Sequence, residues 1–180
     1  MLAIAGCSPA AGPAELAPVF VVLCADPDPE QDPHPCCTGF ALGSQVVTAN
    51  HCAPDDRVQL VSRRQWLTTA SAYSVGTVTR RDEARDIAWL DAPTDGPGLE
   101  LGGSFLPGDS VSALTPVGAK AGIVGGQAGL FWQSTMPVAF GDSGAAVVDA
   151  SGRAVGVVHA CLSADGKACD PMTGIFAGLP

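Results

Sequence analysis

The pentapeptide TANHC, residues 48–52, ends an apolar run, GFALGSQVV at 39–47, and places a histidine directly before a cysteine. A histidine next to a β-strand is more often a satisfied core or surface residue than a functional group. His51 therefore carries little information by itself. It gains meaning from two further stretches of the chain and from the cysteines around it.

The composition indicates a folded, turn-rich protein. The 180 residues include 22 glycines and 15 prolines, and 47% are hydrophobic, which distinguishes the chain from a disordered one. This length is enough for one or two small domains with an adequate core. Eighteen acidic residues against nine basic ones give a formal charge of -9, which repels phosphate backbones and anionic lipid surfaces. We therefore expect no nucleic-acid partner.

Short apolar runs alternate with turn residues along most of the chain. This spacing predicts an all-β fold, a sandwich or barrels, with little helix. The runs lie at 19–23, 39–43, 45–49, 57–62, 73–80, 87–92, 111–117, 130–136, 145–150 and 153–160. The Pro/Gly-rich stretch 92–103 lies midway and predicts a seam between two similar halves, 19–97 and 98–180.

The cysteines and the N-terminus suggest export. Seven cysteines in a chain of this size are typical of an oxidising compartment. MLAIAGC resembles a bacterial lipobox, whose cleavage leaves the cysteine, here Cys7, as a lipidated first residue; residues 1–18 would then be a partial signal and a flexible tether. Only six residues precede Cys7, too few for a signal peptide, so either the start is misassigned or the likeness is chance. We expect a secreted or periplasmic protein that contacts a membrane only through a lipid on Cys7.

Two later stretches complete a pattern with TANHC. FGDSGAAVV (140–148) holds a serine between glycines, and ARDIAWL (84–90) holds an aspartate that enters an apolar strand. Either one alone means little. In the order His51, Asp86, Ser143, the three resemble the motifs of the chymotrypsin/trypsin-like serine proteases, compact bacterial type. The resemblance spans about 36–176 and implies two six-stranded antiparallel Greek-key barrels with the active site in the cleft between them.

The chemistry of these residues is consistent with the resemblance. A serine hydroxyl is a poor nucleophile, so Ser143 needs a base such as His51 beside it. The imidazole in turn needs a carboxylate that fixes its tautomer. We prefer Asp86 for this role because it starts an apolar strand; the competing carboxylates are Asp55, Asp82 and Asp91. The backbone N–H groups of Gly141 and Ser143 would form the oxyanion hole.

The resulting hypothesis is a monomeric serine endopeptidase that hydrolyses polypeptides through an acyl-enzyme, with neither metal nor cofactor. The alternative is a catalytically silent homologue that acts as a secreted binding domain. A disulfide scaffold with chance motifs is a third class, and three motifs in order argue against it.

The resemblance also implies a disulfide scheme. In the family a disulfide fastens the histidine loop to the preceding strand. Cys36 lies sixteen residues before Cys52, which is the family's separation, whereas Cys37 heads CTGFALG, which resembles the CTG of bacterial relatives; both stay open as partners of Cys52. The remaining pairs would be Cys24 with the unused one of these two, and Cys161 with Cys169. The competing interpretation is a metal site formed by HPCC and HC, although vicinal cysteines make a strained zinc pair.

Specificity and activation follow from the resemblance less directly. The residue six before the nucleophile, at the floor of the family's pocket for the P1 side chain, is Pro137, which offers no charge to Arg or Lys. We expect small or medium apolar P1 residues, with Ala160 lining the pocket beside Met136 and Val138. His159 lies one residue out of register with the histidine that faces an acidic P1 residue in glutamyl endopeptidases. It could instead face solvent or hydrogen-bond near Asp86.

Animal members activate by burying a new N-terminus, usually IVGG, against the aspartate before the serine. That aspartate is Asp142 here. An IVGG occurs at 123–126, but cleavage there would detach His51 and Asp86 from Ser143. We interpret it as a strand and turn, which leaves the cation partner of Asp142 unidentified.

Overall fold

The computed structural model describes residues 19–25, 32–68, 73–94, 96–162, 169–170 and 172–180. The expectations for residues 1–18, including a lipid on Cys7, fall outside these ranges. Within them, no helix is both long and apolar enough to cross a membrane.

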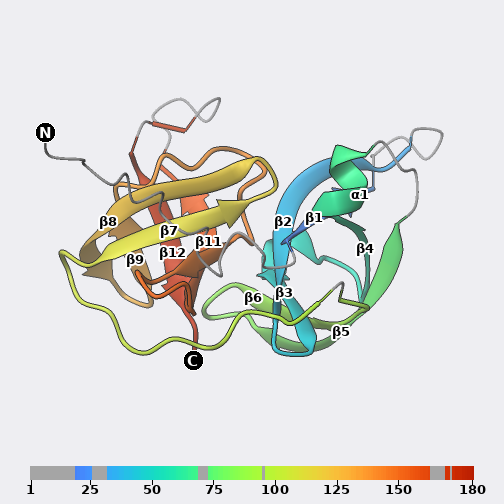
Figure 1. Cartoon of the computed structure of the whole chain (residues 1–180), viewed down its shortest axis with the longest axis horizontal. Coiled ribbons are helices and arrows are strands. Elements are labelled where there is room, and N and C mark those ends of the chain that lie inside the picture. The colour runs from blue at the N-terminus through green and yellow to red at the C-terminus, as the bar shows by residue number, and fades with distance from the viewer. Residues whose placement is uncertain (1–18, 26–31, 69–72, 95, 163–168, 171) are drawn as a thin grey trace, which may run out of the picture.

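The chain forms two closed barrels that lie side by side (Figure 1). In the first barrel six antiparallel strands close in the order β1-β2-β3-β6-β5-β4. Their bounds are β1 Val19–Cys24, β2 His34–Leu42, β3 Gln45–Ala49, β4 Arg57–Ser62, β5 Ser74–Asp82 and β6 Ile87–Asp91. Valine, isoleucine and tryptophan fill β3 and β6, which pair with Val47 opposite Trp89, because such side chains fit a pleated, buried surface.

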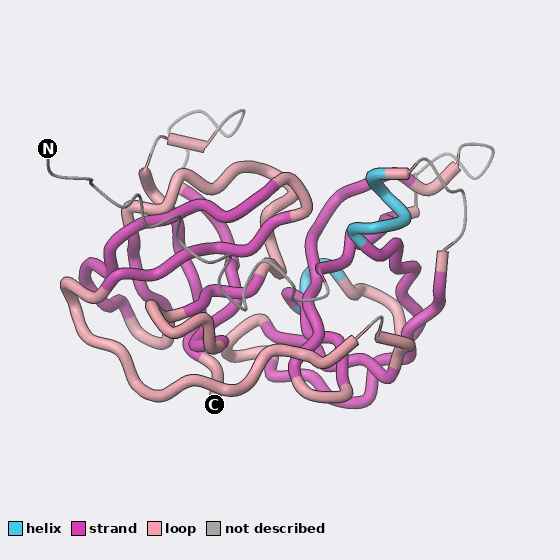
Figure 2. The backbone as a smooth tube through the Cα atoms, in the orientation of Figure 1, coloured by secondary structure: helices cyan, strands magenta, loops and turns pink. Residues whose placement is uncertain are grey.

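The second barrel also closes with six antiparallel strands, in the order β10-β11-β12-β9-β8-β7. Their bounds are β7 Ser110–Thr115, β8 Gly118–Ala128, β9 Phe131–Ser134, β10 Ala146–Val148, β11 Ala154–Cys161 and β12 Gly174–Gly178. Figure 2 shows how little helix accompanies these strands. The expected all-β fold of two six-stranded antiparallel barrels is confirmed.

Three clusters of buried side chains hold the molecule together. One fills the first barrel around Phe20 and Leu60, and another fills the second around Met136 and Phe176. The third cluster joins the barrels and contains, among others, Phe40, Val47, Ile87, Trp89, Leu114, Ala146 and Val157. Because this interface is apolar and buried, it fixes one barrel against the other.

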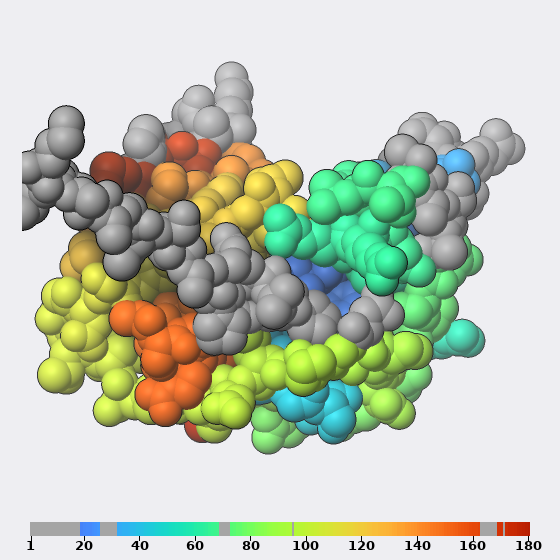
Figure 3. Space-filling model, in the orientation of Figure 1, coloured from blue at the N-terminus to red at the C-terminus, as the bar shows by residue number. Residues whose placement is uncertain are grey.

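The chain passes from the first barrel to the second between β6 and β7. Leu99 bridges Leu42 of the first barrel, and Leu101 bridges Ala154 of the second. This connection runs across the front of both barrels in the space-filling view (Figure 3).

One strand, β12, and one helix were not predicted, and of β8 only the strand and turn at 123–126 was expected. β8 (GAKAGIVGGQA) and β12 (GIFAG) are glycine-rich, so they lack the β-branched signal that marks the other strands. The IVGG sequence lies within β8 as strand, with a bulge between Val124 and Gln127 instead of a turn. The helix α1 (Arg63–Leu67) begins at a capping box formed by Ser62 and Gln65.

Candidate active site

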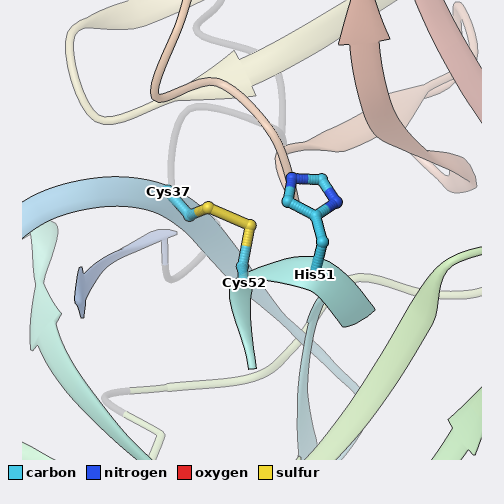
Figure 4. Close-up of side chains that lie close together, drawn as sticks. All are labelled: Cys37, His51 and Cys52. Atoms are coloured by element: carbon cyan, nitrogen blue, oxygen red, sulfur yellow. A yellow bond between two sulfur atoms is a disulfide. The ribbon is translucent and has the colours of Figure 1, made fainter. Parts of the chain in front are cut away.

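His51 lies in the 3₁₀ turn η2 (Asn50–Cys52), which directly follows β3. Arg81 of β5 fixes this turn: its guanidinium donates to Asn50 Oδ1 at 2.7 Å and to the Ala53 carbonyl at 2.5 Å. Cys52 on the other side is joined to Cys37 of β2. Figure 4 shows the His51 ring beside this disulfide, with one ring nitrogen within 4.8 Å of both sulfur atoms. The backbone of His51 is thus held from two sides while its ring stays half-exposed.

The structure decides between the two candidate partners of Cys52. It pairs Cys37 with Cys52, Cys24 with Cys36, and Cys161 with Cys169. The β1–β2 register passes from Val22 opposite Cys37 to Leu23 opposite Pro35, so Cys36 is the extra residue of a β-bulge. A bulge turns one side chain away from the regular alternation, which lets consecutive cysteines reach different partners. As disulfides, Cys37 and Cys52 are not thiolates, so they cannot ligate a metal together with His51.

Removing each β2 disulfide in turn distinguishes an effect on stability from an effect on activity. We expect Cys37→Ser/Cys52→Ser and Cys24→Ser/Cys36→Ser each to lower the free energy of unfolding by about 3 kcal/mol, because the closed loops are similar in length. Only the first pair anchors the turn that carries His51, so only that variant should also lose turnover. Denaturant unfolding measures the first effect, and the enzymatic activity proposed below measures the second. Equal kcat values in the two variants would contradict the anchoring role.

Asp86 directly precedes β6 and is aimed at His51 by its backbone. Its φ of 55° is unusual for a residue other than glycine, and its carbonyl accepts the Asn50 N–H at 2.9 Å. Oδ1 accepts the backbone N–H of His51 at 2.8 Å, and Oδ2 lies 2.6 Å from Nδ1 of the His51 ring. Oδ2 also lies 2.6 Å from Nδ1 of His159. The carboxylate therefore accepts hydrogen bonds from both histidines.

These contacts keep Asp86 ionised. Burial alone would raise the pKa of Asp86, but the hydrogen bonds from His159 and His51 together outweigh burial and hold the pKa well below its usual range. An ionised carboxylate only accepts, so the Nδ1 of His51 must carry the proton and Nε2 is left as the basic atom.

The structure places Asp86, and not its competitors, beside His51. Asp82 is engaged by Arg85 at 2.9 Å, and this hydrogen bond lowers the pKa of Asp82. Asp55 and Asp91 are exposed.

Ser143 lies in a turn that is hydrogen-bonded to the first barrel. The N–H of Thr38 donates to the Ser143 carbonyl at 2.8 Å, and the Thr38 hydroxyl donates to the Gly141 carbonyl at 2.8 Å. Gly144 has φ 86°, and a Cβ there would lie 2.0 Å from the Thr38 carbonyl oxygen. Only glycine therefore lets the turn approach β2 so closely.

The turn also presents two backbone donors. Gly141 has φ 92°, a conformation that few other residues adopt. Among the backbone hydrogen bonds of the described residues, none is donated by the N–H of Gly141 or of Ser143. Both donors are therefore available to an oxyanion, as the sequence suggested. The Ser143 hydroxyl itself donates to the His159 carbonyl at 3.1 Å.

Lys120 of β8 is the cation that Asp142 needs. Its Nζ lies 2.5 Å from Oδ2 of Asp142, and the same oxygen accepts the N–H of Ala139 at 2.6 Å. Asp142 is buried. A charge supplied within the chain thus stabilises the turn before Ser143.

Lys120→Met leaves the buried carboxylate of Asp142 without its cation. We expect the free energy of unfolding to fall by about 3 kcal/mol, the usual cost of a buried charge that loses its partner, and turnover to fall because the turn of Ser143 loosens. Thermal unfolding and kcat measure these changes. Lys120→Met/Asp142→Asn, which removes both charges, should recover much of the stability. If Lys120→Met were as stable as the unchanged protein, the ion pair would have no such role.

The predicted substrate-pocket residues divide into two groups. Pro137 is exposed and Ala160 is partly buried, whereas Met136 and Val138 pack in the core of the second barrel. His159 is the extra residue of a bulge, because the β11–β12 register passes from Val158 to Ala160. The bulge turns its Nδ1 to Asp86, which was the alternative left open by the sequence.

Three residues that position the site were not predicted from the sequence. Thr38, Arg81 and Lys120 act through contacts that join distant parts of the chain. The CTG resemblance was a signal for Thr38. No local pattern marks Arg81 or Lys120.

Comparison with known proteins places the chain in a family. The model of the trypsin-like peptidase domain family matches residues 37–157, about two thirds of the chain. The chain belongs to the trypsin-like peptidase family. No curated protein matches the sequence.

Solved structures of proteases share the fold. The HtrA-type protease AlgW, solved with a decapeptide, has 21% identity and a TM-score of 0.67 over 90% of this chain and 60% of its own. The active form of the Rv3671c protease from M. tuberculosis has 20% identity and a TM-score of 0.68 over 92% of this chain and 77% of its own. The chain thus spans about three fifths of the AlgW chain. At these identities the likeness shows the fold alone.

The trypsin-like match includes His51, Asp86 and Ser143 but ends before His159. The second histidine on Asp86 therefore lies outside the part of the chain that the family match covers.

Proposed function

We propose that this trypsin-like domain is a serine endopeptidase that uses Ser143, His51 and Asp86. The observation that carries the proposal is the paired geometry of Asp86 and His51, with two hydrogen bonds between the same two residues, beside a serine turn whose neighbouring N–H groups are unused. The first barrel contributes the acid and base, and the second contributes the nucleophile.

The reaction begins when the Ser143 side chain turns from the His159 carbonyl to Nε2 of His51. Nε2 takes the hydroxyl proton while Oγ attacks the scissile carbonyl carbon, and the carbonyl oxygen becomes an oxyanion held by the N–H groups of Gly141 and Ser143. Asp86 stabilises the imidazolium. The proton then passes to the leaving amine as the C–N bond breaks, which gives an acyl-enzyme. Water, deprotonated by His51, hydrolyses the ester and regenerates Ser143.

The setting proposed for this activity is extracytoplasmic. Three disulfides join described cysteines, which supports an oxidising compartment. A lipid on Cys7 stays part of this proposal, as does a monomeric state. The substrate is a polypeptide, and the mechanism calls on no metal or cofactor.

A peptide library with varied P1 residues tests the function and the pocket together. We expect cleavage after small or medium apolar residues, because exposed Pro137 offers no partner for a charged P1 side chain. A parallel preparation of Ser143→Ala controls for contaminating proteases. Dominant cleavage after Arg, Lys or Glu contradicts the pocket argument. No cleavage above the Ser143→Ala background contradicts the peptidase function.

A further inference from the structure

Two histidines from different barrels share one carboxylate oxygen. Oδ2 of Asp86 lies 2.6 Å from Nδ1 of His51 and 2.6 Å from Nδ1 of His159. Because an ionised carboxylate can only accept, each ring must donate its Nδ1–H when neutral. His159 is therefore the contribution of the second barrel to the orientation of Asp86.

The surroundings of His159 fix its ring and backbone. The ring packs against Phe131 of β9 at an interplanar angle of 34°, with centroids 4.5 Å apart, and its centroid is 5.8 Å from that of His51. Its backbone carbonyl accepts the Ser143 hydroxyl. Among the described residues, the titratable groups against this ring are Asp86 and His51. His159 thus contacts Asp86 through its ring and Ser143 through its backbone carbonyl.

We propose that His159 is a positioning residue whose ring holds Asp86 for His51 and whose protonation withdraws Asp86 from His51. This inference rests on the proposed peptidase function. A neutral His159 helps to hold the carboxylate in the orientation that His51 needs. A protonated His159 places a full positive charge on the same carboxylate oxygen, and two imidazolium rings at this distance repel each other. His51 then becomes a weaker acceptor for the Ser143 proton.

A metal ion is the competing interpretation of this cluster. His51, Asp86 and His159 offer three ligand atoms within 4.8 Å of one another. Two ligands of a tetrahedral zinc ion stand about 3.3 Å apart, as follows from its bond lengths. The observed separations of 2.6 Å are hydrogen-bond lengths, so protons rather than a metal link these groups.

The kinetic test compares the unchanged protein with His159→Ala and His159→Asn, with EDTA present. We expect His159→Ala to lower kcat on the order of tenfold at pH 8 with little change in KM, because it weakens proton transfer and leaves substrate binding in place. His159→Asn restores a donor near the Nδ1 position and should recover most of this loss. As the pH is lowered, kcat/KM of the unchanged protein should fall because two groups take up protons. In His159→Asn only one protonation should lower kcat/KM. Identical acid limbs, or an unchanged kcat in His159→Ala, would overturn the proposal.

A second measurement needs no turnover. In proton NMR, imidazole N–H groups bound to a carboxylate resonate far downfield, so we expect two such signals in the unchanged protein, one in His159→Ala and neither in Asp86→Asn. A single signal in the unchanged protein overturns the shared carboxylate. Two signals in a protein that hydrolyses nothing contradict the peptidase function and leave the shared carboxylate supported.

Discussion

Ser143→Ala should lower kcat about 10⁶-fold while the protein stays folded, because the members of a Ser-His-Asp triad act as a unit. The hydroxyl makes one hydrogen bond, to the His159 carbonyl, so its loss should change the free energy of unfolding by only about 1 kcal/mol. Peptide hydrolysis measures the first effect and thermal unfolding the second.

Ser104→Ala is the matched control, since Ser104 is exposed in the connection between the barrels. It should keep the activity and stability of the unchanged protein. Activity of Ser143→Ala within tenfold of the unchanged protein would contradict the mechanism.

Asp86→Asn should lower kcat about 10⁴-fold at neutral pH with the fold intact. The carboxylate accepts from the His51 backbone and from both imidazole rings. An amide has only one acceptor oxygen, so its NH₂ group would face a donor and force a ring into the wrong tautomer. The dependence of kcat on pH measures this effect.

Asp82→Asn provides the control for Asp86→Asn. Asp82 pairs with Arg85 and does not contact His51, so the variant should keep its kcat. A larger loss in Asp82→Asn than in Asp86→Asn would mean that the wrong carboxylate had been assigned.

Strands rich in β-branched residues were predictable within a residue or two. β3 and β4 coincide with predicted runs, because valine and leucine between turn residues are strong local signals. Most of β8 was not predicted beyond its IVGG stretch, since alanine and glycine carry no such signal and the strand is defined by pairing with β7 and β9.

The site was predictable where it depends on local motifs. His51, Asp86 and Ser143 each lie in a short recognisable stretch. The Lys120–Asp142 pair joins residues 22 positions apart within the second barrel. The contact of His159 with Asp86 joins residues 73 positions apart and forms only where the two barrels pack against each other. The cysteine pairing depended on a bulge at Cys36, which sequence spacing does not reveal.

Labelling with a fluorophosphonate tests the central claim most directly. An activated serine displaces fluoride from phosphorus, and the adduct forms only where nucleophile, base and oxyanion donors work together. We predict one adduct per chain, located on Ser143 by peptide mass spectrometry, and none in Ser143→Ala. A folded, disulfide-intact protein that stays unlabelled, or that is labelled at another residue, would contradict the account.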